Sequence, residues 1–385
     1  MKEYRLYAGA YTDGRPGNGV FFLRFGADGL RAESVCGGVV NTSYVLPVGD
    51  RLYAVEELDG EAAVLEFSPA AGTSHKRRVV PGSGLCHIAA CGPFLYASGY
   101  AGGTLTGLRQ ADGGVCCFLR HTGHSVRADR QAQAHVHAAL PSPDGRLLLV
   151  ADLGMDRLFR YVVGPDGSLT PDGAQPWVCA APGQGPRHFA FHPNGAWLYL
   201  VAELERSLLV FRSTPSGLQL TATHALRQAG DPADSLAADV HVTPDGRFVY
   251  ASVRGADCIE CFRVLENGGR LEPVGRFSSG GRCPRSFAIS PDGLYLAAAN
   301  QESGNVAVFP RNAQTGALES PAGVLALPQA ACVKWADRRK KHRNSAEAPR
   351  PIEKPRLDPA QQTQAGGKQK GKRREACKIP RDTVE

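Results

Sequence analysis

One sequence motif recurs seven times along this chain, at spacings between 43 and 53 residues. Each copy holds an apolar segment centred on Tyr or an equivalent apolar residue, and most copies are entered through a turn such as Pro-Asp-Gly. Repeats of this length are typical of propeller blades or solenoid units, which bury a core only by stacking on their neighbours. The sequence therefore predicts one ring of seven blades. Its anchor residues are Tyr7, Tyr53, Tyr96, Leu149, Tyr199, Tyr250 and Ala297.

The clearest copies predict antiparallel hairpins, because an apolar run leads into a polar turn and a second apolar run leaves it. No segment shows a sustained apolar stripe of helical period, so little helix is expected. We expect an all-β, seven-bladed β-propeller with four-stranded antiparallel blades. The second halves of these copies read PSPDGRLLLVAD (141–152), HPNGAWLYLVAE (192–203), TPDGRFVYASVR (243–254) and SPDGLYLAAAN (290–300).

The two ends of the repeat array complement each other. YRLYAGAY at residues 4–11 looks like the outgoing strand of a hairpin without its first strand, and QAACVKWA at 329–336 looks like an incoming strand without its partner. Pairing of the two would close the ring and remove the free sheet edges. The sequence thus predicts a propeller domain over residues 1–335.

Residues 336–385 form a basic, low-complexity tail. Residues 337–385 hold 15 Lys and Arg but 7 Asp and Glu, so 29 basic and 30 acidic residues remain for the rest of the chain. With few large apolar side chains, the tail is expected to be disordered. Its KKHR and KGKRR runs could contact nucleic acid, but the lack of interleaved aromatic residues favours a solvated extension.

The cysteines and the first residues suggest a cytoplasmic protein. Eleven cysteines are scattered through strand-like segments, and MKEYRLYAGAYT shows no apolar signal region, so we expect no insertion into a membrane. Cys258 and Cys261 form a CxxC motif, but strand positions i and i+3 face opposite sides, so we interpret them as core residues. No phosphate-binding loop, dinucleotide fingerprint or full set of zinc ligands is present, and no cofactor or metal is expected. The oligomeric state is left open.

A candidate site follows from counting outward from the turn glycines. A hairpin folds at its turn, so residues eight before and eight after the glycine meet at the open end, around the mouth of a central channel. Charged strand ends are often merely solvated, but the repeated register favours a shared site. These positions hold His137, Arg187, Arg285, Glu203, Arg254 and Glu57, and neighbouring positions add His135, His188, Asp152 and Asp239.

The chain resembles the bacterial lactonase family of seven-bladed propellers, which includes cycloisomerase-type 6-phosphogluconolactonases and relatives of carboxymuconate lactonising enzymes. The resemblance spans roughly residues 4–335. Its most specific segments are QAQAHVHAALPSPDGRLLLVADLGMDR (131–157) and GQGPRHFAFHPNGAWLYLVAEL (183–204), with AGAYTDG and YAVEELDGE nearer the start. Where the family often has Asn, this chain has Glu56, Ala202 and Val253, which bears on substrate identity more than on fold.

The resemblance implies metal-independent hydrolysis of 6-phospho-D-glucono-1,5-lactone to 6-phosphogluconate. Such chemistry needs a general base, donors for the developing oxyanion and a cationic clamp for phosphate. Two alternatives are a muconate-type lactonising cycloisomerase and a non-catalytic binding propeller. We assign the base to His137, His188 or Glu203, anion binding to Arg187 and Arg254, and substrate contact or orientation to Glu57, Asp152, Arg285 and His135.

Overall fold

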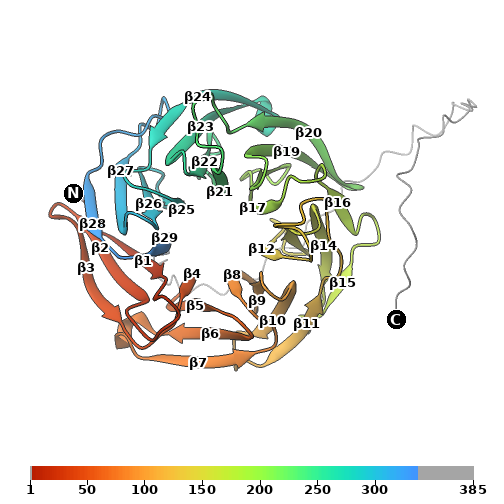
Figure 1. Ribbon diagram of the computed structural model, residues 1–385, viewed down its shortest axis with the longest axis horizontal. Helices are drawn as coiled ribbons and strands as arrows, with labels where there is room; N and C mark the ends of the chain where they lie inside the picture. The colour runs from red at the N-terminus through yellow and green to blue at the C-terminus, as the bar shows by residue number, and fades with distance from the viewer. Residues whose placement is uncertain (1, 337–385) are drawn as a thin grey trace, which may run out of the picture. The chain divides into compact units, whose positions relative to one another are not determined.

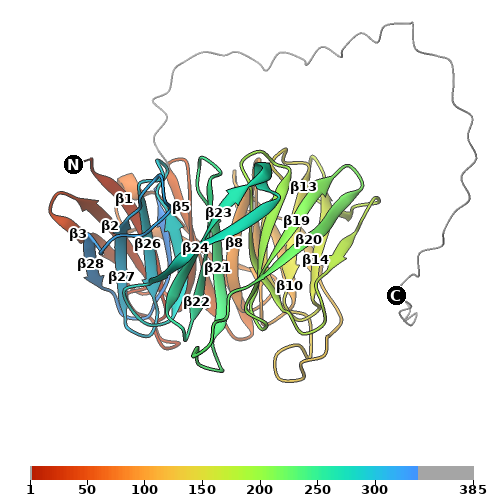
Figure 2. The same ribbon diagram turned by 90° about the horizontal axis from the view of Figure 1, so that it is seen from above.

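A computed structural model describes residues 2–336, which form a closed ring of seven antiparallel sheets (Figure 1). This confirms the predicted fold class. The tail predicted for residues 336–385 lies, from residue 337 onward, outside the described residues. Seen from its edge, the ring has strands that run between its two faces (Figure 2). None of the helices described here is long and apolar enough to cross a membrane.

The chain enters each blade at the centre of the ring and leaves it at the rim, except in the first blade. The first blade, from the centre outward, consists of β29 (Ala330–Trp335), β1 (Tyr4–Ala10), β2 (Val20–Gly26) and β3 (Gly29–Cys36). The second contains β4 (Thr42–Val48), β5 (Arg51–Leu58), β6 (Glu61–Phe67) and β7 (His75–Val80), with the 3-10 turn η1 (Pro69–Ala71). The third contains β8 (Leu85–Cys91), β9 (Phe94–Gly99), β10 (Thr104–Arg109) and β11 (Val115–Arg120).

The remaining blades follow the same order, and two short outer strands pair with the third strand of the fourth blade. That blade contains β12 (Val136–Pro141), β13 (Leu147–Asp152), β14 (Arg157–Val163), β15 (Leu169–Pro171) and β16 (Trp177–Cys179). The fifth contains β17 (Pro186–Phe191), β18 (Trp197–Ala202), β19 (Ser207–Thr214) and β20 (Gly217–Ala225). The sixth contains β21 (Leu236–Val242), β22 (Phe248–Arg254), β23 (Cys258–Leu265), the turn η2 (Glu266–Gly268) and β24 (Arg270–Ser278). The seventh contains β25 (Pro284–Ile289), β26 (Tyr295–Asn300), β27 (Asn305–Pro310) and β28 (Gly323–Ala326).

The ring closes as the sequence predicted. Strand β29 pairs antiparallel with β1, so that Leu6 lies opposite Trp335. The indole Nε1 of Trp335 donates a hydrogen bond of 2.9 Å to the carbonyl oxygen of Ala288 on the seventh blade. The last inner strand therefore joins the first and seventh blades through main-chain and side-chain contacts.

The Pro-Asp-Gly turns owe their composition to backbone geometry. In the sixth blade, the carboxylate of Asp245 accepts a bond of 3.1 Å from the amide of Arg247 and one of 2.5 Å from the hydroxyl of Thr243. Gly246 has φ of +73°, a conformation that favours glycine. These turns lie at the opposite end of the hairpins from the candidate site.

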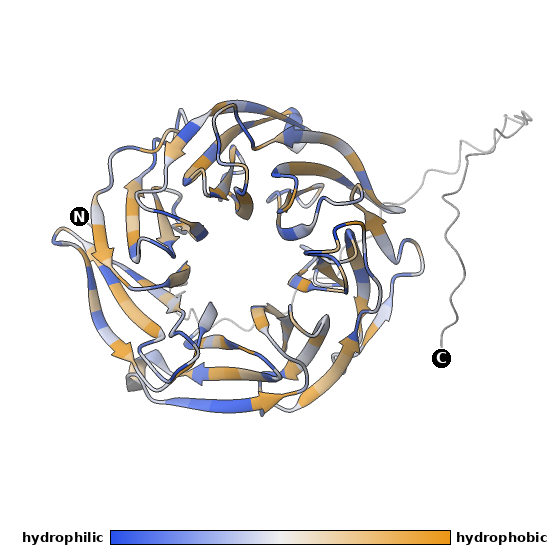
Figure 3. Cartoon of the chain, in the orientation of Figure 1, coloured by the Kyte–Doolittle hydropathy of each residue, from blue (hydrophilic) through white to orange (hydrophobic). Residues whose placement is uncertain are grey.

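Apolar clusters between neighbouring blades form the core, whereas the outermost strand β7 is largely hydrophilic (Figure 3). The CxxC pair illustrates the arrangement. Cys258 is buried in the cluster between the fifth and sixth blades, and Cys261 in the cluster between the sixth and seventh. The two thiols face opposite sides of β23, as the strand period predicted.

Three of the anchor tyrosines tie their blade to the next one. The hydroxyl groups of Tyr96, Tyr199 and Tyr250 donate hydrogen bonds of 3.0, 2.8 and 2.6 Å to Gly167, Gly268 and Gly316, in that order. Each acceptor is the carbonyl oxygen of a glycine in or beside the turn before the next blade's outer strand. These tyrosines are fully buried, so the anchor position combines ring packing with a buried hydrogen bond.

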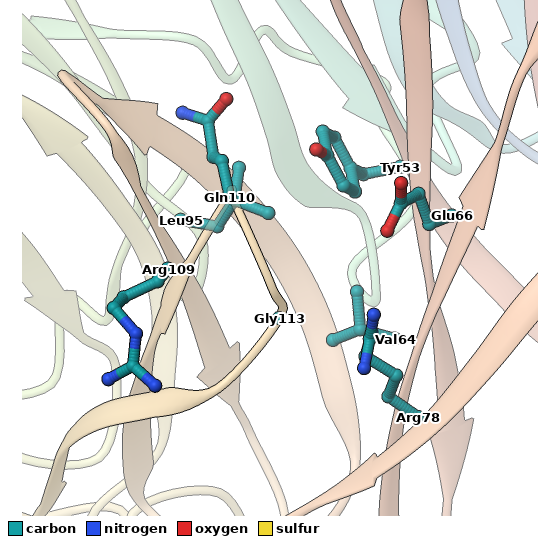
Figure 4. A pocket seen from close by; sticks show the side chains of 8 residues that line it. All are labelled: Tyr53, Val64, Glu66, Arg78, Leu95, Arg109, Gln110 and Gly113. Atoms are coloured by element: carbon teal, nitrogen blue, oxygen red, sulfur yellow. The ribbon is translucent and has the colours of Figure 1, made fainter.

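Tyr53 occupies the same position in the second blade without this hydrogen bond. Its buried hydroxyl has no acceptor in the described residues, and the charged side chains near it include Arg51 and Glu66. A small cavity lies there between the second and third blades, lined by Tyr53, Arg78, Arg109 and Gly113 among others (Figure 4). This cavity belongs to the interface between blades rather than to the candidate site.

Candidate active site

A β-bulge shapes every inner strand where the predicted site residues lie. All seven inner strands show a register shift against the second strand of their blade. In the fourth blade, Val136 faces Asp152 and Ala138 faces Ala151, so His137 is the extra residue. Arg285 is the extra residue in the seventh blade. Bulges re-aim side chains and often accompany functional sites.

Glu203 stands at the centre of a cluster of guanidinium groups. Its Oε2 lies 2.8 Å from Nε of Arg187 and 3.1 Å from Nη2 of Arg254, and its Oε1 lies 2.6 Å from Nη2 of Arg130. Arg187 also donates a hydrogen bond to the carbonyl oxygen of Ala238. The structure thus brings together three predicted residues from the fifth and sixth blades, and adds Arg130, which the sequence analysis missed.

This cluster carries more positive than negative charge. Burial disfavours the ionised form of Glu203, but the three guanidinium groups outweigh it and lower the pKa of Glu203 to about 2. Burial and the neighbouring Arg254 lower the pKa of Arg187 to about 10, so it stays protonated near neutral pH. Three cations and one anion leave a surplus of positive charge, which suits an anionic ligand.

Four aromatic side chains from consecutive blades pack against one another at the centre of the propeller: Tyr44, His87, His137 and His188. The ring centroid of His188 lies 5.2 Å from that of His137 and 5.4 Å from that of His87. Tyr44 stacks at a tilt against His87 with 4.4 Å between centroids. All four side chains are buried.

His188 is held by a buried carboxylate. Its Nδ1 lies 2.8 Å from Oδ1 of Asp239. The backbone amide of Val240 donates to Oδ1 of this carboxylate, and that of Phe287 donates to Oδ2. Oδ2 also lies 3.2 Å from Nε2 of His241. An ionised Asp239 only accepts hydrogen bonds, so Nδ1 of His188 carries the proton and Nε2 presents its lone pair. Nε2 is buried and has no partner within residues 2–336.

The buried histidines are neutral near neutral pH. Burial lowers the pKa of His188 to about 4, helped by Arg187 and opposed by Asp239. Burial also places the pKa values of His137 and His87 well below the usual range, and nearby cations act in the same direction. A neutral imidazole with a free nitrogen can accept a proton from water.

Arg285 and Glu57 form a second, charge-balanced pair. Nη2 of Arg285 lies 3.7 Å from Oε2 of Glu57, and the same oxygen accepts a bond of 2.7 Å from the hydroxyl of Tyr11. The guanidinium also lies over the Tyr11 ring, 5.2 Å from its centroid. Both charged side chains remain partly exposed, so solvent reaches this side of the site.

Asp152 and His135 support the fourth blade. Oδ1 of Asp152 accepts the backbone amide of His135 at 2.8 Å, and Oδ2 lies 2.7 Å from Nδ1 of His121. The ring of His135 stacks on Tyr100 with 4.2 Å between centroids, and its Nδ1 lies 2.9 Å from the Tyr100 carbonyl oxygen. Asp152 therefore acts on the connection that leads into its own blade, whereas Tyr100 lies beside Arg130.

Turn length explains why His87 escaped the sequence analysis. Only Gly92 and Pro93 separate β8 from β9, whereas five residues separate β12 from β13. Counting from the turn glycine therefore misaligns the third blade, and alignment by strand would have placed His87 beside His188. Arg130 lies in a connection outside the repeat, so no periodic signal could have found it.

Comparisons with known proteins agree with this architecture. A family model described as a lactonase seven-bladed β-propeller matches residues 5–335. The 6-phosphogluconolactonase of Bacillus subtilis is 29% identical over 350 residues, which cover 87% of this chain and 99% of that protein.

Two solved structures share the fold. A putative 6-phosphogluconolactonase from Bacteroides fragilis matches with a TM-score of 0.80 and 29% identity, over 87% of this chain and 98% of that one. A periplasmic gluconolactonase from Pseudomonas aeruginosa matches with a TM-score of 0.77 and 27% identity, over 87% and 99% of the two chains. On this evidence the chain belongs to the lactonase family of seven-bladed β-propellers and is a lactonase.

Proposed function

We propose that this lactonase hydrolyses 6-phospho-D-glucono-1,5-lactone to 6-phosphogluconate, by general acid and base catalysis at the centre of the ring. The names of its relatives support a sugar lactone as substrate. The observation that carries the proposal is the buried pair of His188 and Asp239, which lies next to a cluster with surplus positive charge. The first supplies a base and the second binds anionic oxygen.

His188 is the best of the three candidate bases. Glu203 makes three ion pairs and has a pKa of about 2, so it is a poor acceptor for a proton from water. His137 faces the thiol of Cys86, with 3.9 Å between Sγ and Nδ1, rather than a carboxylate. Asp239 fixes the tautomer and the ring of His188 and stabilises the imidazolium when it forms, as in other carboxylate-oriented bases.

In the proposed reaction, Nε2 of His188 takes a proton from water while the water oxygen attacks the lactone carbonyl carbon. Arg187 and Arg254 stabilise the negative charge that develops on the carbonyl oxygen. The bond from this carbon to the ring oxygen then breaks, and the imidazolium returns its proton to that oxygen. The product carboxylic acid loses its proton to solvent. The reaction drawn this way needs no metal or cofactor.

The remaining predicted residues take supporting roles in this proposal. Glu203 holds the guanidinium groups in position, and His137 and His135 line the site. Glu57 and Arg285 hold sugar hydroxyls, and Asp152 orients the segment that carries His135 and His137. Residues 1–335 are the proposed catalytic domain, and a cytoplasmic location is proposed as well, since ten cysteines within the described residues carry free thiols. Fractionation of cells would test the location.

A coupled assay tests the reaction and the base together. Freshly prepared 6-phosphogluconolactone is supplied with 6-phosphogluconate dehydrogenase and NADP, after correction for spontaneous opening of the ring. We expect His188→Ala to lose more activity than His137→Ala, because only His188 has the orienting carboxylate. If the wild-type protein opens carboxymuconolactone but does not hydrolyse the phosphorylated lactone, the proposed function is wrong and the muconate-type lactonising cycloisomerase takes its place.

A further inference from the structure

Arg130 enters the site from outside the repeat. It lies in the connection of residues 121–135 between β11 and β12, and its Nη2 reaches Oε1 of Glu203 at 2.6 Å and the hydroxyl of Tyr100 at 3.4 Å. Glu203 follows β18 in the fifth blade, and Tyr100 follows β9 in the third. Arg130 therefore spans three blades on the face of the ring where Glu203 lies.

The three guanidinium groups around Glu203 differ in their access to solvent. The side chain of Arg187 is 2% exposed and that of Arg254 is 13% exposed, whereas that of Arg130 is 30% exposed. They also contact different atoms, because Oε2 of Glu203 faces the two more buried arginines and Oε1 faces Arg130. An anion that approaches from solvent meets Arg130 first.

Arg130 also retains donors for a ligand. Its hydrogen bonds to described residues all use Nη2, which leaves the N–H groups on Nη1 and Nε. Nη2 carries two N–H groups, and its contact with Tyr100 at 3.4 Å is weak, so one Nη2 N–H is available to a ligand together with the adjacent N–H of Nη1 or Nε. Such a parallel pair matches two oxygens of a phosphate group. Arg130 can therefore keep its contact with Glu203 while it binds a phosphate.

The connection around Arg130 is well fixed. The hydroxyl of Ser125 donates a bond of 2.5 Å to Asp156, and the side-chain amide of Gln131 donates one of 2.8 Å to the carbonyl oxygen of Leu153. Asp156 also accepts the amides of Gly183 and Gly185, both at 2.7 Å. Because the segment is already ordered, binding through Arg130 avoids much of the entropy cost of fixing a loop.

We propose that Arg130 recognises the phosphate group of a phosphorylated sugar lactone and so sets the preference of this enzyme for phosphorylated over unphosphorylated lactones. This inference rests on the proposed function and adds the residue that determines specificity. Arg187 and Arg254, which are more buried, are left for the carbonyl end of the substrate. One substrate thus spans the exposed and the buried guanidinium groups of a single cluster.

Arg130→Gln tests the proposal, with Arg127→Gln as its control. Arg127 lies in the same connection, is 41% exposed and pairs with Asp129 instead of Glu203. We measure kcat/KM for 6-phosphogluconolactone and for glucono-1,5-lactone. The ratio of the two values should fall about 10- to 100-fold in Arg130→Gln, mainly through KM of the phosphorylated lactone, as expected for one lost charge-assisted contact. Arg127→Gln should keep the wild-type ratio.

An equal loss on both lactones would mean that Arg130 acts only through Glu203, and would overturn the proposal, as would an unchanged ratio. Calorimetric titration with 6-phosphogluconate and with gluconate gives a readout that needs no turnover. Wild-type protein that hydrolyses neither lactone would refute the proposed function, while the titration would still decide the role of Arg130. If Arg130→Gln does not fold, Arg130→Lys keeps the charge, loses the fork and should give an intermediate ratio.

Discussion

Nδ1 of His188 and Oδ1 of Asp239 are joined by a hydrogen bond of 2.8 Å between the fifth and sixth blades. The two residues are 51 positions apart, about one repeat, and both lie at the β-bulge of their inner strand. The bulge lets neighbouring residues of β17, Arg187 and His188, both reach buried polar partners near the centre of the ring. One repeated backbone irregularity thus supplies the candidate base, its orienting carboxylate and a cation.

Replacement of Asp239 by Asn should remove most of the activity while the fold persists. Asn donates as well as accepts, so it no longer fixes the tautomer of His188 or stabilises the imidazolium. We expect kcat to fall about 10²- to 10⁴-fold with a smaller change in KM. Asp231→Asn is the control, because Asp231 pairs with Arg276 on the outer strand β24, and its kcat should stay close to wild type. A full kcat in Asp239→Asn would remove this pair from the mechanism.

The rate should depend on pH as expected for a base with a depressed pKa. His188 must be neutral to accept a proton, and its pKa is about 4. We therefore expect kcat/KM to stay level from pH 8 to about 5 and to fall only at lower pH. A stopped-flow assay corrected for spontaneous hydrolysis measures this profile. An inflection near pH 6.5 would point instead to a histidine with an ordinary pKa.

Folding stability should decline on mild acidification. His87, His137 and His188 have depressed pKa values in the folded protein, so they take up protons on unfolding once the pH falls below their unfolded pKa of about 6.5. As the pH falls from about 6.5 toward the pKa of the folded state, each of these histidines should lower the free energy of unfolding by about 1.4 kcal/mol per pH unit. Urea unfolding between pH 7 and 5 measures the slope. His87→Phe should reduce it, whereas replacement of the exposed His124 by Gln should leave it unchanged.

The tyrosine links between blades should contribute measurably to stability. Tyr250→Phe removes the donor to the buried carbonyl oxygen of Gly316 and should lower the free energy of unfolding by about 1–2 kcal/mol. Tyr53→Phe is a matched control, since its hydroxyl lacks such an acceptor in the ring, and should change stability by less than about 0.5 kcal/mol. Equal losses in both variants would show that the hydrogen bond contributes little beyond the ring packing.

The fold could be predicted from the sequence because the signals that specify it are local and repeated. Each Pro-Asp-Gly turn specifies one hairpin, and seven anchors at blade spacing specify the ring. Even the pairing of β1 with β29 could be predicted, because each end of the array lacks the strand that the other supplies. The opposed faces of Cys258 and Cys261 followed from the strand period alone.

The candidate site could be predicted only in part from the sequence. Counting from the turns found Arg187, Glu203 and Arg254, and the structure brings the two guanidinium groups within 2.8 and 3.1 Å of the Glu203 carboxylate. It gave no sign of the bulges, because a bulge depends on how two strands pair. It also named Asp152 as a residue that contacts the substrate or orients the site, and the carboxylate of Asp152 bonds to His121 and to the backbone amides of His135 and Met155.

The sequence by itself determined the number of blades, the order of strands and the face on which the charged residues gather, since all three depend on spacing along the chain. Only the tertiary structure decided which of those residues touch. The three guanidinium groups on Glu203 come from positions as far apart as 130 and 254, and Asp239 meets His188 across two blades. Such contacts, and the charge balance and pKa values that follow from them, exist only when the ring has closed and buried these side chains.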